Sequence, residues 1–393
     1  MSTGTTFSHL ECIDCGQPYD RDVNQYPCPA CGGILDPQYS LDEVTLDPTD
    51  IEQRSGSMWT YQELLPVSSA AHIVSLGEGD TPLLNCPTLA NRLGIDRLLV
   101  KDEGQNPTNT FKDRGLSAAI SVECERGTPT VGIASAGNAG QAASTYAARA
   151  GLDCHVYLNQ QVGDIQRQLV SVHGAELHLV DGQIGDAGAA CAADAERLGY
   201  QAINSFQTPY RHDGKKTMGY EIFEDLGWQS PDEIVYPTGG GVGLIGIWRA
   251  FMDLRELGWI PEIPPRLVVA QAEGVAPIVR ALEQGERQHE PWIGAHSVAK
   301  GLEIPDPGAS AWIIDVVTRS GGTGVSVSDS TAITAAIEMA QSDGIEMCIP
   351  SAVALAGAMK RADDGAYDGD ETVVVVNTGA GVKSAQRLAA NLS

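Results

Sequence analysis

From about residue 72 onward, short runs of β-branched residues alternate with alanine-rich stretches of helical length. Strands that are joined by helices lie parallel in a sheet, and the helices cover both faces of that sheet. The alternation therefore predicts an α/β fold. The expected strands are 97–103, 129–135, 154–158, 176–180, 233–237, 266–273 and 372–377. The expected helices are 111–125, 139–150, 164–173, 216–226, 243–257, 330–342, 351–362 and 383–391.

The alternating region is too long for one sheet of ordinary width. About 320 residues fit two open twisted sheets, each in its own lobe with helices on both faces, better than one very wide sheet. Residues 1–37 are rich in Cys, Pro and Gly, and residues 38–71 form a polar connector. We therefore expect a small separate segment, a connector and a two-lobed body that binds ligands at the carboxyl ends of its strands.

The chain is strongly acidic, with 51 Asp and Glu against 25 Lys and Arg and a net charge of -26. Phosphate groups repel such a surface, so we expect neither nucleic acid nor a membrane as a partner. Charge of this kind keeps a protein soluble where salt screens it heavily, which suggests a salt-loving host. The first residues lack the features of a secretory signal, and no apolar run reaches about 18 residues, so we expect a cytoplasmic protein.

Four of the nine cysteines form two Cys-x2-Cys pairs near the N-terminus. This pattern is typical of a tetrahedral Zn²⁺ site with four thiolates, which is structural because no ligand position stays open. Gly16 and Gly32 follow the two pairs and allow tight turns. The alternatives are two disulfides or a site that has lost its metal. The expected zinc ligands are Cys12, Cys15, Cys28 and Cys31.

Lys112 stands in the segment NPTNTFKDRG, between an expected strand and an expected helix. In the first turn of that helix, the helix dipole disfavours a cation. The pKa of the amine should therefore be lowered, as suits a lysine that forms a Schiff base. The alternative is a solvated lysine that pairs with Asp113.

The segment SAGNAG, residues 135–140, also links a strand to a helix. Its small residues let backbone N–H groups face an anion at the start of the helix, and a substrate carboxylate fits such a place. Asn138 adds an amide that could hold a ring hydroxyl. The alternative is a tight turn that binds nothing.

The segment GGGVG, residues 239–243, follows the expected strand 233–237. Its glycines expose successive N–H groups, which suits the wrapping of one terminal phosphate. Residues 241–246 also read G-x-G-x-x-G, and Glu273 ends the next strand, where a ribose-binding acid is sought. A dinucleotide-dependent oxidoreductase is therefore a rival interpretation.

Two weaker signals lie in other loops. Thr378 follows the last expected strand, where its hydroxyl could bond a buried heteroatom; the alternative is a simple turn. Arg211, Lys215 and Lys216 lie within six positions of a chain that is poor in cations. Such a cluster suggests a site for a dianion, such as a phosphate ester, and the alternative is ion pairing with nearby carboxylates.

Taken together and in this order, these segments resemble those of the fold-type II pyridoxal-phosphate (PLP) enzymes, the tryptophan synthase β-like family. Within that family they are similar to the threonine synthases. NPTNTFKDRG, SAGN and PTGGGVG carry the resemblance, and SLGEGDTPLL at 75–84 looks like the family's opening segment. The stretch YRHDGKKTMGYE favours threonine synthases over dehydratases. Many members also have a Cys-rich N-terminal ribbon.

The resemblance implies a role for each candidate residue. Lys112 would bind PLP covalently through its amine and then act as acid and base. Asn138 would bind the PLP 3-hydroxyl, and Thr378 would meet the pyridine nitrogen. The PLP phosphate would be bound by Gly239, Gly240, Gly241, Val242 and Gly243. The substrate carboxylate would be bound by Ser135, Ala136, Gly137 and Gly140, and the leaving phosphate of the substrate by Asn204, Ser205, Arg211 and Lys215 or Lys216.

The resemblance also implies domains and a reaction. Residues 72–125 and 206–393 would form a large PLP-binding domain, and residues 126–205 a small mobile domain that binds the substrate carboxylate. The implied reaction converts O-phospho-L-homoserine and water into L-threonine and phosphate, by γ-elimination followed by β-addition. A homodimer is expected by analogy.

Two departures from the family pattern concern the substrate. Asn109 and Thr110 stand where many relatives have Gly-Ser or Ser-Ser, and the glycine loop looks dehydratase-like. The rival within the family is therefore a threonine or serine dehydratase, or a related β-replacement enzyme. Outside the family, the rivals are the oxidoreductase and a zinc-ribbon interaction protein with a non-catalytic body.

Overall fold

The computed structural model describes residues 4–54 and 56–392 of the chain. Residues 1–3 of the expected N-terminal segment, residue 55 of the expected connector and residue 393 lie outside the described residues. The chain divides into two compact units. Unit 1 comprises Met1–Asp80 and Lys112–Met218, and unit 2 comprises Thr81–Phe111 and Gly219–Ser393.

Unit 2 is built on a six-stranded sheet with the strand order β12-β11-β10-β13-β5-β4. All neighbouring strands are parallel except β4 and β5. The central strand β13 reads TVVVVN and is buried over most of its length, as expected for a parallel strand with helices on both faces. The strands are β4 (Leu83–Asn85), β5 (Arg97–Asp102), β10 (Glu233–Pro237), β11 (Arg266–Ala272), β12 (Thr323–Val327) and β13 (Thr372–Asn377).

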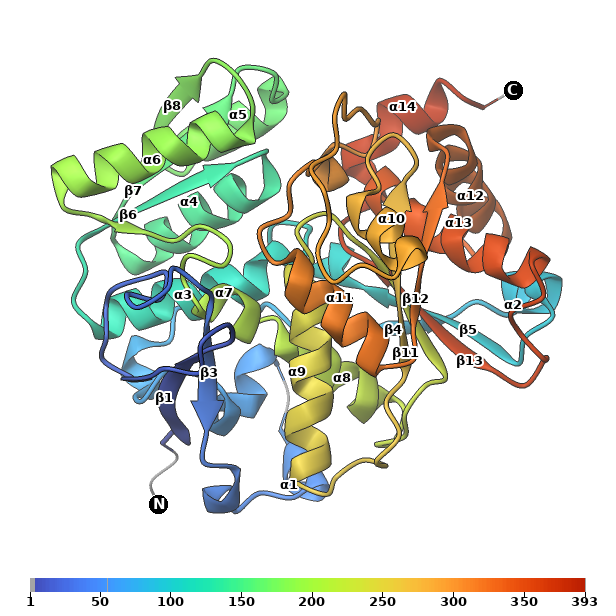
Figure 1. Ribbon diagram of the computed structural model, residues 1–393, viewed down its shortest axis with the longest axis horizontal. Coiled ribbons are helices and arrows are strands. Elements are labelled where there is room, and N and C mark those ends of the chain that lie inside the picture. The colour runs from blue at the N-terminus through green and yellow to red at the C-terminus, as the bar shows by residue number, and fades with distance from the viewer. Residues whose placement is uncertain (1–3, 55, 393) are drawn as a thin grey trace. The chain divides into compact units, whose positions relative to one another are not determined.

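Helices pack against this sheet (Figure 1). The contact with α13 is close, because a Cβ added at Gly357 would lie 2.7 Å from Val325 Cγ1. The α-helices of unit 2 are α2 (Pro87–Leu93), α9 (Val242–Glu256), α10 (Pro277–Gln284), α11 (Ser310–Arg319), α12 (Asp329–Ser342), α13 (Ile349–Asp363) and α14 (Ala385–Ala389), and α8 (Lys216–Asp225) enters it from unit 1. Its 3₁₀ turns are η4 (Glu103–Gln105), η5 (Lys300–Leu302) and η6 (Gly381–Ser384).

Unit 1 contains a four-stranded parallel sheet with the order β8-β7-β6-β9. Its main core joins α3 and α4 to the two central strands through residues such as Ile120, Tyr146, Ile133 and Val156. The strands are β6 (Thr130–Ser135), β7 (Asp153–Asn159), β8 (Glu176–Val180) and β9 (Gln201–Ala202). The α-helices of unit 1 are α1 (Pro48–Glu52), α3 (Lys112–Glu125), α4 (Asn138–Ala150), α5 (Asp164–Val172), α6 (Ile184–Leu198) and α7 (Tyr210–Asp213), and its 3₁₀ turns are η1 (Leu41–Glu43), η2 (Met58–Leu64) and η3 (Ala70–His72).

The N-terminal ribbon of unit 1 is an antiparallel sheet with the order β2-β1-β3, formed by β1 (Phe7–Cys12), β2 (Pro18–Asp20) and β3 (Leu35–Tyr39). Its apolar face, which includes Phe7 and Leu10, belongs to one core cluster with Ala118 of α3 and Tyr210 of α7. The ribbon is therefore anchored to the helix that Lys112 opens.

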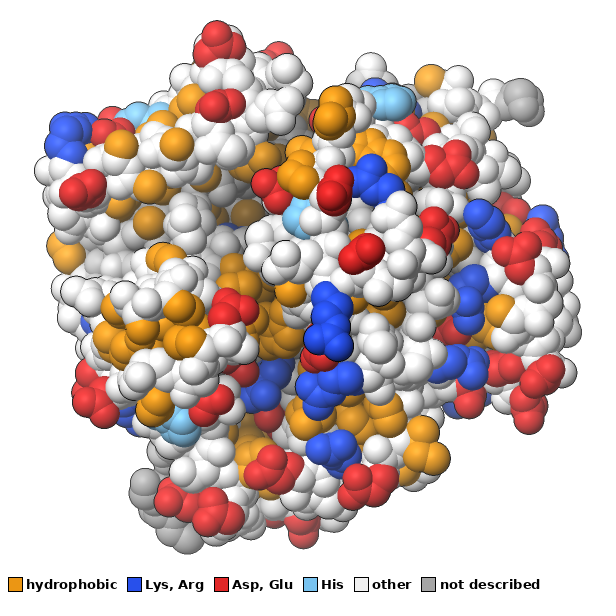
Figure 2. Space-filling model, viewed as in Figure 1, with side chains coloured by type: hydrophobic (Ala, Val, Ile, Leu, Met, Phe, Trp, Pro, Cys, Tyr) orange, Lys and Arg blue, Asp and Glu red, His pale blue; other side chains and the backbone are white. Residues whose placement is uncertain are grey.

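The predicted α/β class with parallel sheets is confirmed, and every expected strand and helix is present with small shifts at the ends. After residue 72, the strands and α-helices that the sequence pattern missed are β4, β9, β12, α2, α6, α7, α10 and α11, and most of them are short or contain glycine. Carboxylates are spread over the visible face of the molecule, in keeping with the acidic composition (Figure 2). Among the described residues, no helix is long and apolar enough to cross a membrane.

Candidate active site

Three neighbouring strands of unit 2 bring candidate residues to one edge of the sheet. β10 pairs with β13, with Val235 opposite Val375, and β13 pairs with β5, with Asn377 opposite Asp102. The glycine loop 239–243, Thr378 and the segment that leads to Phe111 therefore leave the carboxyl ends of adjacent parallel strands. This is the edge at which open α/β sheets bind ligands.

The positions 239–243 require or permit glycine for different structural reasons. Gly241 has a φ of +73°, and a Cβ there would collide with Ile313. A Cβ on Gly243 would collide with the hydroxyl of Tyr236. Gly240 has no atom within 4 Å of an added Cβ, so its side of the loop is open. The loop stands at the start of α9, and the first N–H groups of a helix have no partner within the helix and suit an anion.

Thr378 is held by a serine that the sequence pattern did not single out. The Oγ of Ser351 lies 3.0 Å from Thr378 Oγ1 and accepts a hydrogen bond of 2.8 Å from the Thr378 amide. The carbonyl of Thr378 accepts a hydrogen bond of 3.1 Å from the amide of Phe111. Thr378 is thus a positioned hydroxyl in a structured loop, and Ser351, in the first turn of α13, orients it.

Tyr236 is a second residue that sequence reasoning missed. Its side chain is 2% exposed, and its hydroxyl has no hydrogen-bond partner among the described residues. Burial, with the charge of Glu103 in addition, raises the pKa of Tyr236 well above its usual value. A buried, unpaired hydroxyl beside Gly243 is unusual enough to mark this loop as a place where a ligand completes the hydrogen bonding.

In unit 1, Lys112 is the first residue of α3 and is half-buried. Burial and the charge of Arg211 lower the pKa of its amine to about 7. The predicted direction is confirmed, but the cause differs from the expectation. The causes are burial, which is the larger, and the neighbouring Arg211 cation.

A buried polar network lies under α3. Glu78, from the segment SLGEGDTPLL, is fully buried. Its carboxylate accepts hydrogen bonds from Trp59 Nε1 at 3.0 Å, from Ser117 Oγ at 2.5 Å and from Tyr146 OH at 2.8 Å. These donors come from the connector, from α3 and from α4, so Glu78 joins three elements around Lys112 and its helix.

The segment SAGNAG links β6 to α4, as expected. The hydroxyl of Ser135 accepts hydrogen bonds from the amides of Gly137 at 3.0 Å and Gly140 at 2.9 Å. Two of the N–H groups that were expected to face a carboxylate are therefore used within the loop. Ala136 is exposed, and Asn138 is half-buried at the first position of α4.

The predicted cation cluster lies beside α3, within unit 1. A Cβ on Gly115 would collide with Lys215 Nζ, and the Lys215 ammonium donates a hydrogen bond of 2.8 Å to the carbonyl of Arg211. Arg211 is 2% exposed; its Nη1 donates to the Ile203 carbonyl at 3.2 Å, and its Nε has no partner in the described part of the chain. Burial lowers the pKa of Arg211 to about 10.

The third member of that cluster lies in a different environment. Lys216 forms an ion pair of 2.9 Å with Asp213, and its ammonium stands 3.5 Å from the centre of the Tyr39 ring. Ion pairing, which was the alternative interpretation of the cluster, thus describes Lys216. Unit 1 brings Lys112, Arg211 and Lys215 together.

Asn204 and Ser205 differ in their contacts. The Asn204 amide oxygen accepts from Ala134 N at 2.7 Å, and its amide nitrogen donates to Gln207 Oε1 at 2.9 Å. Asn204 therefore fixes the chain after β9 to β6, whereas Ser205 is exposed.

The four N-terminal cysteines lie together, with all four sulfur atoms within 4.8 Å of one another. The Sγ atoms of Cys12 and Cys31 are 3.5 Å apart, and those of Cys15 and Cys28 are 3.9 Å apart. Tetrahedral Zn–S bonds of about 2.3 Å would separate the sulfurs by about 3.8 Å. Gly16 and Gly32 have φ values of +69° and +78°, as the expected tight turns require.

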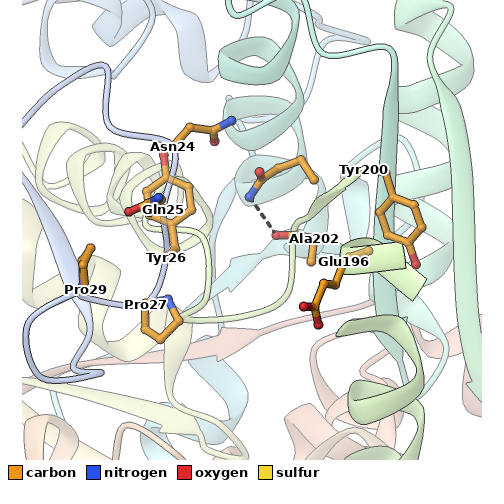
Figure 3. Close-up of a pocket in the computed structure, with 10 residues that line it drawn as sticks. Asn24, Gln25, Tyr26, Pro27, Pro29, Glu196, Tyr200 and Ala202 are labelled. Atoms are coloured by element: carbon orange, nitrogen blue, oxygen red, sulfur yellow. Dashed lines mark hydrogen bonds between the residues drawn. The ribbon is translucent and has the colours of Figure 1, made fainter. Parts of the chain in front are cut away.

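A cavity of about 660 Å³ opens elsewhere in unit 1, between the ribbon segment 24–29 and the residues 195–202 that end α6 and form β9 (Figure 3). Its lining includes Tyr26, Glu196 and Tyr200 and none of the predicted site residues. The candidate active site is therefore defined by its residues and not by this cavity.

Residues 74–379 match the family described as pyridoxal-phosphate dependent enzyme. The chain therefore belongs to the PLP-dependent enzymes. It is 36% identical to the threonine synthase of Methanosarcina acetivorans, over 96% of this chain and 93% of that protein. It is 34% identical to the threonine synthase of Methanocaldococcus jannaschii, over 95% of this chain and 92% of that protein. Within the PLP-dependent enzymes, the chain thus belongs to the threonine synthase family.

Solved structures agree with the fold. A fungal L-serine ammonia-lyase from Rhizomucor miehei is 21% identical, with a TM-score of 0.68 over 80% of this chain and 98% of that one. This likeness confirms the predicted fold-type II architecture. Family membership also sets aside the oxidoreductase and the non-catalytic ribbon protein as interpretations.

Proposed function

We propose that this chain is a PLP-dependent lyase that converts O-phospho-L-homoserine and water into L-threonine and phosphate; its curated relatives carry the name threonine synthase. One observation supports this substrate above all: Lys112, whose amine has a pKa of about 7, lies in unit 1 together with the buried Arg211 and Lys215. An amine that is neutral near pH 7 suits covalent chemistry on a carbonyl, and paired cations suit a phosphate leaving group.

The residues present fit the cofactor. Gly240 leaves the open side of the loop for the PLP phosphate, with Gly239, Gly241, Val242 and Gly243 around it, and the unpaired Tyr236 hydroxyl lies beside the loop. Thr378 would meet the pyridine nitrogen, and Asn138 the 3-hydroxyl. PLP, when bound, withdraws electrons from the substrate carbons and so stabilises carbanions.

The protein residues would bind the substrate and move its protons. Lys112 can take a proton at a pH near 7 and return it, because its amine is poised at that pH. Arg211 and Lys215 would bind the leaving phosphate, and the Nε of Arg211 is a donor without a partner in the described chain. The loop 135–140 would orient the substrate carboxylate, as part of a small mobile domain, 126–205.

We also propose that Cys12, Cys15, Cys28 and Cys31 hold a structural Zn²⁺. The support is the clustering of the four sulfur atoms at separations near those of tetrahedral thiolate coordination. The metal would tie the two tight turns of the ribbon together. Chelation and sulfur-specific labelling would reveal whether the thiolates are metal-bound.

We also propose a cellular location, an oligomeric state and a class of partner for the enzyme. A cytoplasmic homodimer that binds a small amino-acid substrate, and neither nucleic acid nor membrane, agrees with the net charge of -26 and with the free thiols of the chain. Sedimentation of the purified chain tests the dimer.

The substrate is tested by two product assays on the PLP-loaded protein. Phosphate release from O-phospho-L-homoserine is compared with ammonia release from L-threonine and L-serine. We expect phosphate release with formation of L-threonine to dominate. Ammonia release at the higher kcat/KM would instead identify a dehydratase.

The role of Lys112 is tested independently of turnover. Borohydride reduction of the loaded protein, followed by peptide mass spectrometry, should place the cofactor on Lys112, and the visible-edge absorption should be lost in Lys112→Ala. Lys300→Ala, which changes an exposed lysine, is the control and should keep both properties. Cofactor attachment to any other lysine would contradict the proposal.

A further inference from the structure

Two neighbouring strands of unit 1 carry three side chains of types that commonly bind metals, His155, Glu176 and His178, and the proposed reaction does not use them. β7 and β8 pair in parallel, with His155 opposite Glu176 and Tyr157 opposite His178 (Figure 1). Residues two positions apart on a strand share a face. His155, Glu176 and His178 therefore lie on one face of the sheet, at its edge.

The donor atoms of this cluster are close together. His155 Nδ1 lies 3.0 Å from His178 Nε2. The Oε2 of Glu176 lies 3.5 Å from His155 Nδ1, and its Oε1 lies 3.5 Å from His178 Nε2. A metal with bonds of about 2.0–2.2 Å to nitrogen and oxygen places its donors about 2.9 Å apart at right angles and about 3.4 Å apart at the tetrahedral angle. The observed separations of 3.0 and 3.5 Å lie close to these two values.

The two imidazole rings are held in place by aromatic stacking. His155 stacks on Tyr200 with ring centres 5.0 Å apart, and His178 stacks on Tyr157 with ring centres 4.3 Å apart. The two tyrosine hydroxyls are joined by a hydrogen bond of 2.9 Å, and Tyr157 donates to Asp194 at 2.7 Å. The stacking therefore limits the rotation of both imidazole rings and keeps His155 Nδ1 close to His178 Nε2.

The cluster is also accessible. The side chain of Glu176 is 66% exposed, whereas those of His155 and His178 are 15% and 27% exposed. An ion can therefore arrive from solvent through the carboxylate side and keep water at its remaining positions. Two imidazoles and one carboxylate suit a divalent first-row transition ion better than Mg²⁺ or Ca²⁺, which prefer oxygen.

We propose that His155, Glu176 and His178 bind a second divalent transition-metal ion, with Zn²⁺ as the test ion. The ion would fasten the edge strand β8 to β7. We assign it no part in the reaction, because none of its three ligands belongs to the residues proposed to bind the cofactor or the substrate; His155 lies opposite Gly132 of β6, three positions before the loop that begins at Ser135. This site is separate from the cysteine cluster, which lies in the ribbon.

The test counts metal in the untagged holoprotein. Wild type, Glu176→Gln and His178→Gln are incubated with Zn²⁺ and passed through a desalting column, and bound zinc per chain is measured. The comparison between proteins isolates the histidine-dependent ion, whatever the cysteine cluster binds. We expect one equivalent more in wild type than in either variant, and a Zn²⁺ affinity at this site at least tenfold weaker in both variants.

His289→Gln is the matched control, because His289 pairs with Asp306 at 3.0 Å and does not belong to the cluster. It should keep the full metal content of wild type. Glu176→Gln alters an exposed side chain, so its fold and its product formation should be unchanged. Equal zinc content in wild type and in both cluster variants would overturn the proposal, and so would the same loss in His289→Gln.

Discussion

The burial of Lys112, together with the charge of Arg211, brings the pKa of the Lys112 amine to about 7. Two cations that share a buried region disfavour each other, and the lysine is the one that can lose its proton. The Lys112 amine is therefore suited to covalent chemistry near pH 7. The Arg211 cation that helps to lower its pKa also suits an anionic leaving group.

Arg211→Gln should raise the pKa of Lys112, by up to about one unit, because burial remains as the larger cause. The pH dependence of Lys112 acylation in the cofactor-free protein, followed by peptide mass spectrometry, measures this. The Lys300 peptide of the same digest corrects for reagent decay. The same variant should raise the KM for the phosphorylated substrate. An unchanged titration midpoint would mean that Arg211 does not act on Lys112.

The contribution of Lys112 to the stability of the cofactor-free protein should grow as the pH rises above 7. Folded Lys112 is neutral there, whereas the unfolded chain keeps its proton until about pH 10.4, so the unfolded state binds more protons in this window. Below pH 7 both states are protonated and the contribution is constant. Lys112→Met should lack this part of the slope when urea unfolding is compared from pH 7 to pH 10. Parallel curves for the two proteins would contradict the lowered pKa.

Gly240→Ala and Gly243→Ala should separate cofactor binding from stability. A Cβ at Gly240 meets open space, so this variant should keep its unfolding free energy but bind PLP at least tenfold more weakly, because the methyl group enters the phosphate side of the loop. A Cβ at Gly243 collides with Tyr236, so this variant should lose about 1–3 kcal/mol of stability. Urea unfolding without cofactor and fluorescence titration with PLP distinguish the two effects.

Glu78→Gln should destabilise the protein by about 2–4 kcal/mol, because the buried carboxylate accepts hydrogen bonds from Trp59, Ser117 and Tyr146, and an amide cannot satisfy all three donors. Glu262→Gln, at a side chain that is 87% exposed, is the control and should change the unfolding free energy by less than about 0.5 kcal/mol. Similar changes in unfolding free energy for the two variants would show that the hydrogen bonds to Glu78 contribute little to stability.

Removal of metal from the cysteine cluster should lower the thermal midpoint and weaken substrate binding. Three side-chain pairs join the ribbon to the segment of Arg211: Tyr26 with Tyr210, Asp36 with His212 and Tyr39 with Asp213. A strong chelator and Cys31→Ser should act alike, and each should raise the KM for the phosphorylated substrate. If the chelator leaves both the midpoint and the KM unchanged, the cluster does not stabilise the ribbon through a metal.

The sequence pattern was a good guide to elements with long and regular apolar periods. The strand TVVVVN and the helix that begins at Lys112 were both expected, because their residue types suit one conformation only. The strand TGVSV was missed, since it is short and contains a glycine that approaches α10. The helix 184–198 was missed for a related reason, because Gly185 and Gly188 dilute its pattern.

For the candidate site, prediction from the sequence has a different limit. The sequence pattern placed Lys112 in the first turn of a helix and the glycine loop and Thr378 just after strands, and the structure has them at these positions. It could not reveal Glu78, Tyr236 or Ser351, because each matters through partners that are distant in the chain. Asn204 stood next to the cation cluster in the sequence, yet both ends of its amide are occupied by Ala134 and Gln207.

The attachment of the ribbon to α7 also has a consequence for folding during synthesis. Tyr26 and Tyr210, which share a hydrogen bond, are 184 positions apart. The ribbon is synthesised before α7, and α3 to α6 and the strands among them lie between the two in the chain. Its apolar face, with Phe7 and Leu10, can therefore be covered only in part, by residues such as Trp59 and Ala118, until α7 is made, so early closure of the cysteine turns would stabilise the ribbon in the nascent chain.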